Sequence, residues 1–168
     1  FTATRRGVVK KTVLAAYRNI RRDGIIALRI LDDDALIGAA LTDGRQDIVL
    51  ETRAGVAVRF CESEVRPTGR VSTGVKGIDL RGDDEVVDMV VLSGQGSLLT
   101  ICENGFGKRT EAGEYPAIHR GGKGVLDIKT TARNGRVVAC KEVRDEDEVM
   151  LVTQNGILIR MPVSEISR

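Results

Sequence analysis

The segment AIHRGGKGVL, Ala117–Leu126, holds the residues of this chain that are best suited to bind a phosphate group. Arg120 and Lys123 carry positive charges, and three glycines let backbone N–H groups approach an anion without an intervening side chain. A nucleotide-binding P-loop would require glycine, four residues, glycine, lysine and a serine or threonine at the start of a helix. Here Lys123 is followed by Gly124 and a strand-like run. The segment therefore favours phosphate contact and argues against nucleotide binding.

Two other groups of residues could support catalysis, but neither forms a catalytic pattern. His119 has no Ser, Cys or Asp partner in the surrounding sequence, so we interpret it as a surface loop residue. The acidic clusters Asp32–Asp34, Asp83–Glu85 and Asp145–Glu148 contain the oxygen ligands that Mg²⁺ prefers. They fall at turns between predicted strands, and we interpret them as solvated turn residues. We predict no catalytic residue and no metal site.

The phosphate-binding segment is one copy of an internal repeat. The segments RNIRRDGIIAL, RVSTGVKGIDL and IHRGGKGVLDI all run from a basic or glycine-rich loop into a strand-like run. A second element aligns in four copies, FTATRRGVVKKT, IVLETRAGVAVRF, LLTICENGFGKRT and VMLVTQNGILIRM, around Gly7, Gly55, Gly105 and Gly156. The period of about 50 residues is typical of repeat architectures. Each of these four copies predicts a β-hairpin with a tight primed turn.

Further strand-like runs lie between the hairpins and give four strands per period. They are rich in Val and Ile: GIIALRI, ALIGAAL, DIVLET, GIDL, EVVDMVVL, SLLTIC, VLDIKTT, RVVACKEV and EVMLVT. TVLAAYRNIRR could form one or two helical turns, whereas its counterparts are predicted to be loops. A β-sandwich, the main alternative, would not explain the regular period. We therefore predict an all-β, propeller-like fold of about three to four four-stranded antiparallel blades, with repeats at approximately 1–47, 48–96, 97–147 and an incomplete 148–168.

A basic residue follows each hairpin glycine by four positions: Lys11, Arg59, Arg109 and Arg160. One interpretation is a solvated strand end, and the other is a repeated basic surface. Phosphate contacts repeated once per blade would suit a long polyanion that follows the rim and is bound by charge rather than by base reading. Aromatic residues make up only 3% of the chain, which argues against base stacking on single strands.

The composition sets the remaining limits. The chain has 168 residues and a formal net charge of +2, so a basic face has to come from uneven placement of charges. Three dispersed cysteines, with no signal peptide and no apolar run of about 18 residues, indicate small buried residues in a reducing cytoplasm. Because Phe1 lies within a strand-like run, we expect the chain to be a piece of a longer protein.

Several stretches resemble the C-terminal domains of the A subunits of DNA gyrase, from the bacterial type IIA topoisomerases. The resemblance covers essentially the whole chain and is carried by GVVKKTVL, DDDALIGAALTDG, RFCESEVRPTGRVSTGVKGIDL, NGFGKRTEAGEYP, KGVLDIKTTARNG and LIRMPVSEIS. The corresponding C-terminal domain of topoisomerase IV is the near alternative. The resemblance implies a β-pinwheel, a propeller-like disc whose blades exchange strands with their neighbours. It also implies that a basic rim wraps and bends duplex DNA without sequence specificity, and so supports ATP-dependent negative supercoiling by the whole enzyme.

The family's signature box has the sequence Gln-Arg-Arg-Gly-Gly-Lys-Gly. The run Arg120-Gly121-Gly122-Lys123-Gly124 matches its last five positions, whereas Ile118 and His119 replace the first two. We interpret this run as a degenerate copy on a later blade, which contacts DNA without being the essential box. The family's catalytic tyrosine belongs to another domain. Tyr17 and Tyr115 do not match its motif, so we interpret them as blade-packing or loop residues.

The charge pattern and the resemblance together give the predicted DNA contacts: Lys10, Lys11, Arg21, Arg22, Arg59, Arg66, Arg70, Lys76, Lys108, Arg109, Arg120, Gly121, Gly122, Lys123, Gly124 and Arg160. The implied partners are double-stranded DNA, the remainder of the gyrase A protein and the gyrase B protein, with no membrane and a cytoplasmic, nucleoid-associated location. No cofactor is expected in this chain, because the ATP and Mg²⁺ of the whole enzyme are implied to bind other domains. The alternatives are a protein-interaction propeller and an enzyme built on a propeller. No recurring constellation supports the enzyme.

Overall fold

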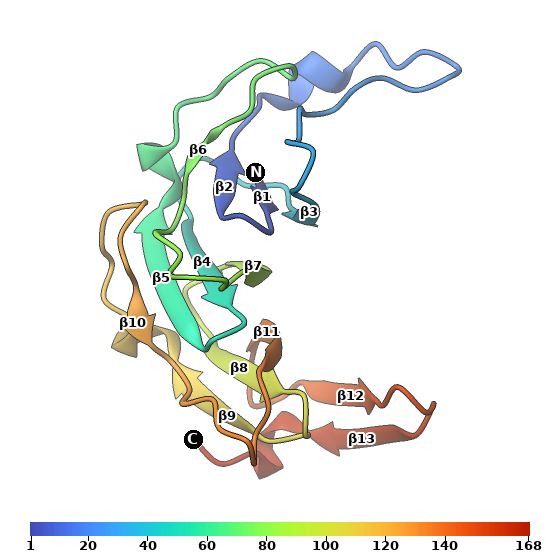
Figure 1. Ribbon diagram of the computed structural model, residues 1–168. Helices are drawn as coiled ribbons and strands as arrows, with labels where there is room; N and C mark the ends of the chain where they lie inside the picture. Colours follow the sequence, from blue (N-terminus) through green and yellow to red (C-terminus); the bar gives the residue numbers. More distant parts are fainter.

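The computed structural model describes all 168 residues as a curved row of small β-sheets (Figure 1). Four antiparallel hairpins form its framework: β1 (Thr2–Thr4) with β2 (Val8–Lys10), β4 (Asp47–Thr52) with β5 (Val56–Cys61), β8 (Ser97–Cys102) with β9 (Gly107–Glu111), and β12 (Glu148–Val152) with β13 (Leu158–Pro162). The other strands are β3 (Leu36–Ala39), β6 (Val75–Lys76), β7 (Val86–Val91), β10 (Val125–Leu126) and β11 (Val137–Val143). Single 3-10 turns are η1 (Leu14–Tyr17), η2 (Glu62–Glu64), η3 (Ala112–Glu114) and η4 (Val163–Glu165). None of these helical turns has the length or the apolar character needed to cross a membrane.

The sheets share strands between consecutive repeats. Their orders are β3-β1-β2-β6, β10-β5-β4-β7, β11-β8-β9 and β12-β13. β6 pairs with β2 of the preceding hairpin, with Val75 opposite Val9, and β10 pairs with β5 in the same way, with Val125 opposite Ala57. In Figure 1, β6, β10 and β9 lie on the convex side of the row, and β3, β7 and β11 lie on the concave side. The predicted all-β arrangement of antiparallel blades is therefore confirmed, with two complete four-stranded sheets.

Aliphatic side chains fill the spaces between consecutive sheets. The largest buried cluster joins the first two sheets and includes Val9 and Phe60. Two further clusters join the second sheet to the third, around Val49 and Leu98, and the third to the fourth, around Leu99. Because full burial of one large aliphatic side chain contributes about 1.5–3 kcal/mol, these clusters can hold the blades together without any tryptophan.

The hairpin turns differ from the tight primed turns that the sequence predicts. In the first hairpin, the Gly7 amide donates to the Thr4 carbonyl at 2.9 Å, and Gly7 has a φ of +76°. A type I′ turn needs positive φ at both central residues. In this chain only glycines have a positive φ, so Asn104, which precedes Gly105, does not have the φ that a type I′ turn requires. Each turn is therefore a three-residue loop that ends in a left-handed glycine. The Thr4 hydroxyl closes the first turn by accepting the Val8 amide at 3.1 Å.

Five other local predictions need correction. We call β6 and β10 the outer strands, because each pairs with the hairpin of the preceding repeat. Residues 24–30 contain no strand, since this chain has no hairpin before them with which an outer strand could pair. Residues 77–80 follow the outer strand β6 rather than forming it, and only two residues of VLDIKTT form β10. The counterparts of the predicted helical turn are 3-10 turns rather than loops. Cys102 and Cys140 are buried as predicted, whereas Cys61 is only partly buried.

Gly55 brings the second hairpin turn against the segment that follows β10. The amides of Asp127 and Ile128 donate to the Gly55 carbonyl at 2.9 and 3.2 Å. A Cβ added at Gly55 would lie 2.1 Å from the Ile128 carbonyl oxygen. Gly105, at the same place in the next hairpin, has a φ of +78° but no atom within 4 Å of its Cβ position. The two glycines therefore share a backbone conformation and differ in contact.

Glu51 is a buried carboxyl without a hydrogen-bond partner. It lies in β4 with no exposed surface, and neither carboxyl oxygen has a donor. Burial, reinforced by the charges of Asp127, Asp84 and Asp88 and opposed by Lys108, raises the pKa of Glu51 to about 9. The carboxyl is therefore protonated at neutral pH.

We predict that Gly55→Ala destabilises the chain more than Gly105→Ala. Both alanines carry the cost of a left-handed backbone, about 1–2 kcal/mol. Only the alanine at position 55 also forces the backbone of Ile128 to move. Denaturant unfolding of the two variants measures the difference, and equal losses of stability would contradict the close approach.

We also predict that Glu51→Gln flattens the pH dependence of stability. The folded-state pKa of Glu51, about 9, exceeds the ordinary value of 4.5. The contribution of protonated Glu51 to the free energy of unfolding is therefore complete below pH 4.5 and is lost as the pH rises to about 9. The loss reaches about 1.4 kcal/mol per pH unit within that window. Unfolding free energies measured from about pH 5 to about pH 9 should fall less in the variant than in the parent. Parallel profiles would show that Glu51 ionises normally in the folded chain.

Candidate nucleic-acid interface

The basic residues that follow the first two hairpin glycines bind the next repeat. Lys11 Nζ donates to the Glu62 carbonyl at 2.8 Å, and Arg59 Nη1 donates to the Ala112 carbonyl at 2.8 Å. Glu62 and Ala112 are the first residues of η2 and η3, so the two contacts are equivalent. Arg59 Nε also donates to Asp47 Oδ2 at 2.8 Å. These bases connect one blade to the next.

The other two bases of this series pair with acids. Arg109 is buried, and its Nη1 lies 2.5 Å from Asp145 Oδ1. Arg160 is exposed and pairs with Glu148 across its own hairpin. All four bases thus have protein partners, and of the four only Arg160 is exposed to solvent.

Lys10 and Lys108 are also held by the protein. Lys10 is buried, and its Nζ donates to the Arg70 carbonyl at 2.5 Å. Burial, followed by the charge of Arg70, lowers the pKa of Lys10. Lys108 Nζ lies 3.3 Å from Oδ1 of the buried Asp127, which also accepts the Tyr115 hydroxyl at 2.6 Å. Tyr115 is therefore a packing residue, as predicted.

Free basic residues occupy the loops that precede the outer strands. Arg66, before β6, and Lys123, before β10, are exposed and have neither an ion pair nor a side-chain hydrogen bond. Arg21–Arg22 are equally free and lie in the loop after η1, which projects from the end of the row in Figure 1. Lys76 is exposed but pairs with Asp79 at 2.6 Å. The loops before the outer strands are the places where the predicted bases remain available.

The remaining predicted bases, Arg70 and Arg120, reach back to the preceding repeat. Arg70 Nη1 donates to the Ile26 carbonyl at 2.6 Å, and Arg120 Nη1 donates to the Lys76 carbonyl at 3.2 Å. His119, beside Arg120, is exposed with its Nδ1 3.3 Å from a Glu64 oxygen. The interpretation of His119 as a surface residue is confirmed.

The glycines of this loop are bonded to the protein through their backbone. The Gly121 amide donates to the Gly77 carbonyl at 2.6 Å, and the Gly122 carbonyl accepts the Asp79 amide at 2.8 Å. The Gly121 N–H therefore points at a protein acceptor and is not free for an anion. Lys123 provides the free charge of the run.

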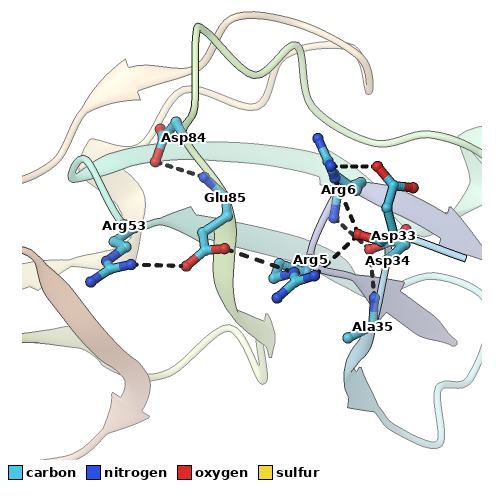
Figure 2. Close-up of polar contacts among 8 residues, drawn as sticks. All are labelled: Arg5, Arg6, Asp33, Asp34, Ala35, Arg53, Asp84 and Glu85. Carbon is cyan, nitrogen blue, oxygen red and sulfur yellow. Dashed lines mark hydrogen bonds and ion pairs between the residues drawn. The ribbon is translucent and has the colours of Figure 1, made fainter.

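At the hairpin turns, charges of opposite sign pair with one another across the blades (Figure 2). Glu85 lies between Arg5, at 3.8 Å, and Arg53, at 3.3 Å. The second Nη of Arg53 lies 3.1 Å from Glu103 Oε1. The Arg136 amide, followed by Arg53, lowers the pKa of Glu103. The turn end of the blades is therefore charged but largely neutralised by its own pairs.

The acidic clusters close turns as well as facing solvent. Asp34 Oδ1 accepts the Arg6 amide at 2.8 Å (Figure 2). One repeat later, Asp84 Oδ1 accepts the Ala54 amide at 2.9 Å. No group of three or more His, Cys, Asp or Glu side chains is arranged to hold a metal ion. The sequence interpretation as solvated turn acids missed these amide contacts.

Sequence reasoning also missed several exposed bases that have no side-chain partner. Arg81 and Arg136 border a cleft of about 380 Å³ together with Lys123, and the acids Asp79 and Asp84 line the same cleft. Arg18, Arg29, Arg45 and Lys129 are exposed as well. Arg29, Arg81 and Lys129 each directly follow one of the three aligned loop-and-strand segments, so the repeat did carry a signal for these three bases.

The comparisons with known proteins agree with this geometry. The family model of the DNA gyrase C-terminal domain, a beta-propeller, matches four times, at residues 1–43, 46–93, 96–144 and 147–168. The chain is 49% identical over 167 residues to the DNA gyrase A protein of Salmonella typhimurium and 45% identical over 168 residues to that of Staphylococcus aureus. Each alignment covers 99% of this chain and 19% of the relative, so the chain spans about a fifth of the length of these relatives.

Two solved structures have the same fold. The C-terminal domain of DNA topoisomerase IV superposes with a TM-score of 0.92 at 29% identity, over 98% of this chain and 52% of that one. A DNA gyrase A C-terminal domain superposes with a TM-score of 0.90 at 25% identity, over 99% of this chain and 56% of that one. Both are pinwheel relatives of the row of blades described above. With family-model matches along nearly all of its length, the chain belongs to the family of DNA gyrase C-terminal domains.

Proposed function

We propose that the chain binds duplex DNA without sequence specificity, and wraps and bends it, as part of the C-terminal domain of a DNA gyrase A protein. The observation that carries this proposal is the recurrence of free bases in one loop of three successive repeats. Arg21–Arg22, Arg66 and Lys123 occupy the loops that precede the outer strands or their counterpart. The other predicted bases all have protein partners, so among the predicted bases these loops supply the charge that a polyanion can reach.

Phosphate contacts repeated along a curved row favour a bent duplex. Smooth bending of 20–30 base pairs by 40–90° costs roughly 1–6 kcal/mol, which several phosphate contacts together can offset. The loops contain no Phe or Trp that could stack on bases, Tyr115 is buried, and the Tyr17 hydroxyl donates to the Ala27 carbonyl. Charge and shape are therefore the proposed basis of recognition.

The roles of the whole protein follow from the family and belong to the same proposal. The remainder of the gyrase A protein and the gyrase B protein would be partners in ATP-dependent negative supercoiling, with ATP and Mg²⁺ bound outside this chain. DNA cleavage would likewise be performed elsewhere, and the chain would contribute no catalytic residue. Such a protein would act on the nucleoid, in the bacterial cytoplasm.

We predict that Lys123→Gln lowers the salt dependence of duplex binding. Loss of one phosphate contact should reduce the slope of log K against log salt by about 0.9. Arg45→Gln removes the same charge from an exposed site outside these loops and should leave the slope unchanged. Fluorescence anisotropy with two duplexes of equal length and different sequence measures the slope and the specificity. Absence of duplex binding by the parent chain at low salt would overturn the DNA proposal in favour of a protein-interaction propeller.

A further inference from the structure

Arg120 forms its polar contacts with the preceding repeat. Its Nε donates to the Glu64 carbonyl at 3.1 Å, its Nη1 to the Lys76 carbonyl at 3.2 Å, and its amide to Glu64 Oε2 at 3.2 Å. Two of these acceptors are backbone carbonyls, whose positions are set by η2 and β6. The guanidinium thus points toward the preceding blade.

The same contact recurs one repeat earlier. Arg70 and Arg120 each stand four residues before a glycine, Gly74 and Gly124, and each donates Nη1 to a carbonyl of the preceding repeat. Both acceptors, at positions 26 and 76, also stand two residues after a glycine. The contact is therefore a property of the repeat rather than an accident of one loop.

Gly74 and Gly124 allow these loops to lie close to the preceding hairpins. A Cβ at Gly124 would lie 2.6 Å from the Ala57 carbonyl oxygen, and a Cβ at Gly74 would lie 2.5 Å from the Val9 carbonyl oxygen. The loops are therefore pressed against the hairpins at equivalent points. Lys123 stands next to Gly124, exposed and without a partner.

We infer that Arg120, and Arg70 in the repeat before it, are positioning residues for the outer loops rather than phosphate contacts. Each guanidinium holds its loop against a carbonyl of the preceding outer segment. In the third repeat this places Lys123 where the phosphodiester backbone of a duplex can reach it. The ligand part of this inference rests on the proposed DNA binding, whereas the positioning part does not.

The substitution Arg120→Lys distinguishes a positioning role of Arg120 from a phosphate contact. Lysine keeps the positive charge and most of the alkyl chain but lacks the planar fork that donates to Glu64 and Lys76 together. A phosphate contact made by charge would survive Arg120→Lys. A positioning contact would not.

The first experiment measures amide hydrogen exchange in the DNA-free chain. The reporters are the Gly121 amide, which donates to the Gly77 carbonyl, and the Asp79 amide, which donates to the Gly122 carbonyl. Arg120→Lys and Arg120→Gln should each speed exchange at both amides by about tenfold, which corresponds to the loss of one or two hydrogen bonds. Lys123→Gln and the control Arg45→Gln should leave both amides unchanged. Amides of β4 and β5 serve as the internal reference for global unfolding.

The second experiment measures duplex affinity and its salt slope in the same variants. Arg120→Lys should weaken binding severalfold although no charge is lost, whereas Lys123→Gln should lower the slope by about 0.9 with exchange unaltered. Parent-like protection at Gly121 and Asp79 in Arg120→Lys would overturn the positioning role. A slope lowered by about 0.9 in Arg120→Gln, with protection intact, would instead make Arg120 a phosphate contact. If the parent binds no duplex, the exchange results still decide the positioning role, and only the DNA proposal fails.

Discussion

The pairing of an outer strand with the hairpin of the preceding repeat is the constraint on which the other features depend. Val75 pairs with Val9, and Val125 pairs with Ala57, so two sheets are completed by residues from the following repeat. Because backbone hydrogen bonds fix both distance and register, each blade has one allowed position relative to its neighbour. The glycines at 74 and 124 then bring the loops into contact with the hairpins. The places of the loop charges follow from the sheet.

Charge in this chain serves two purposes that composition alone does not separate. One group of bases joins blades, through carbonyls, as Lys11 and Arg59 do, or through a carboxylate of the next repeat, as Arg53 does with Glu103. The other group, with Arg66 and Lys123, has no protein partner. The net charge of +2 therefore does not show that many basic side chains already contact carbonyls or carboxylates of the protein. The proposed interface depends on the minority that is left over.

The sequence predicted the fold class and the repeat, because glycine spacing and alternating apolar runs are local signals. It did not predict which bases are free. Lys11 and Arg59 recur at a regular spacing, but regularity is equally typical of a contact that each blade makes with the next. Their partners Glu62 and Ala112 lie a full repeat away, and only the three-dimensional structure brings them together. The hairpin turns were mispredicted for a related reason, since an Asn-Gly pair fits both a primed turn and a loop that ends in glycine.

Strand donation across repeats also bears on the order in which the protein acquires its structure. A hairpin released from the ribosome remains one strand short until the following repeat has been synthesised, because Val8 pairs with Lys76 and Val56 with Leu126. Until then its outer edge presents unpaired backbone groups, the kind of edge through which nascent chains aggregate. Translation pauses within a repeat would prolong that exposure, whereas pauses just after an outer strand would not. In this pinwheel, the timing of synthesis therefore affects how long an aggregation-prone strand edge is exposed during folding.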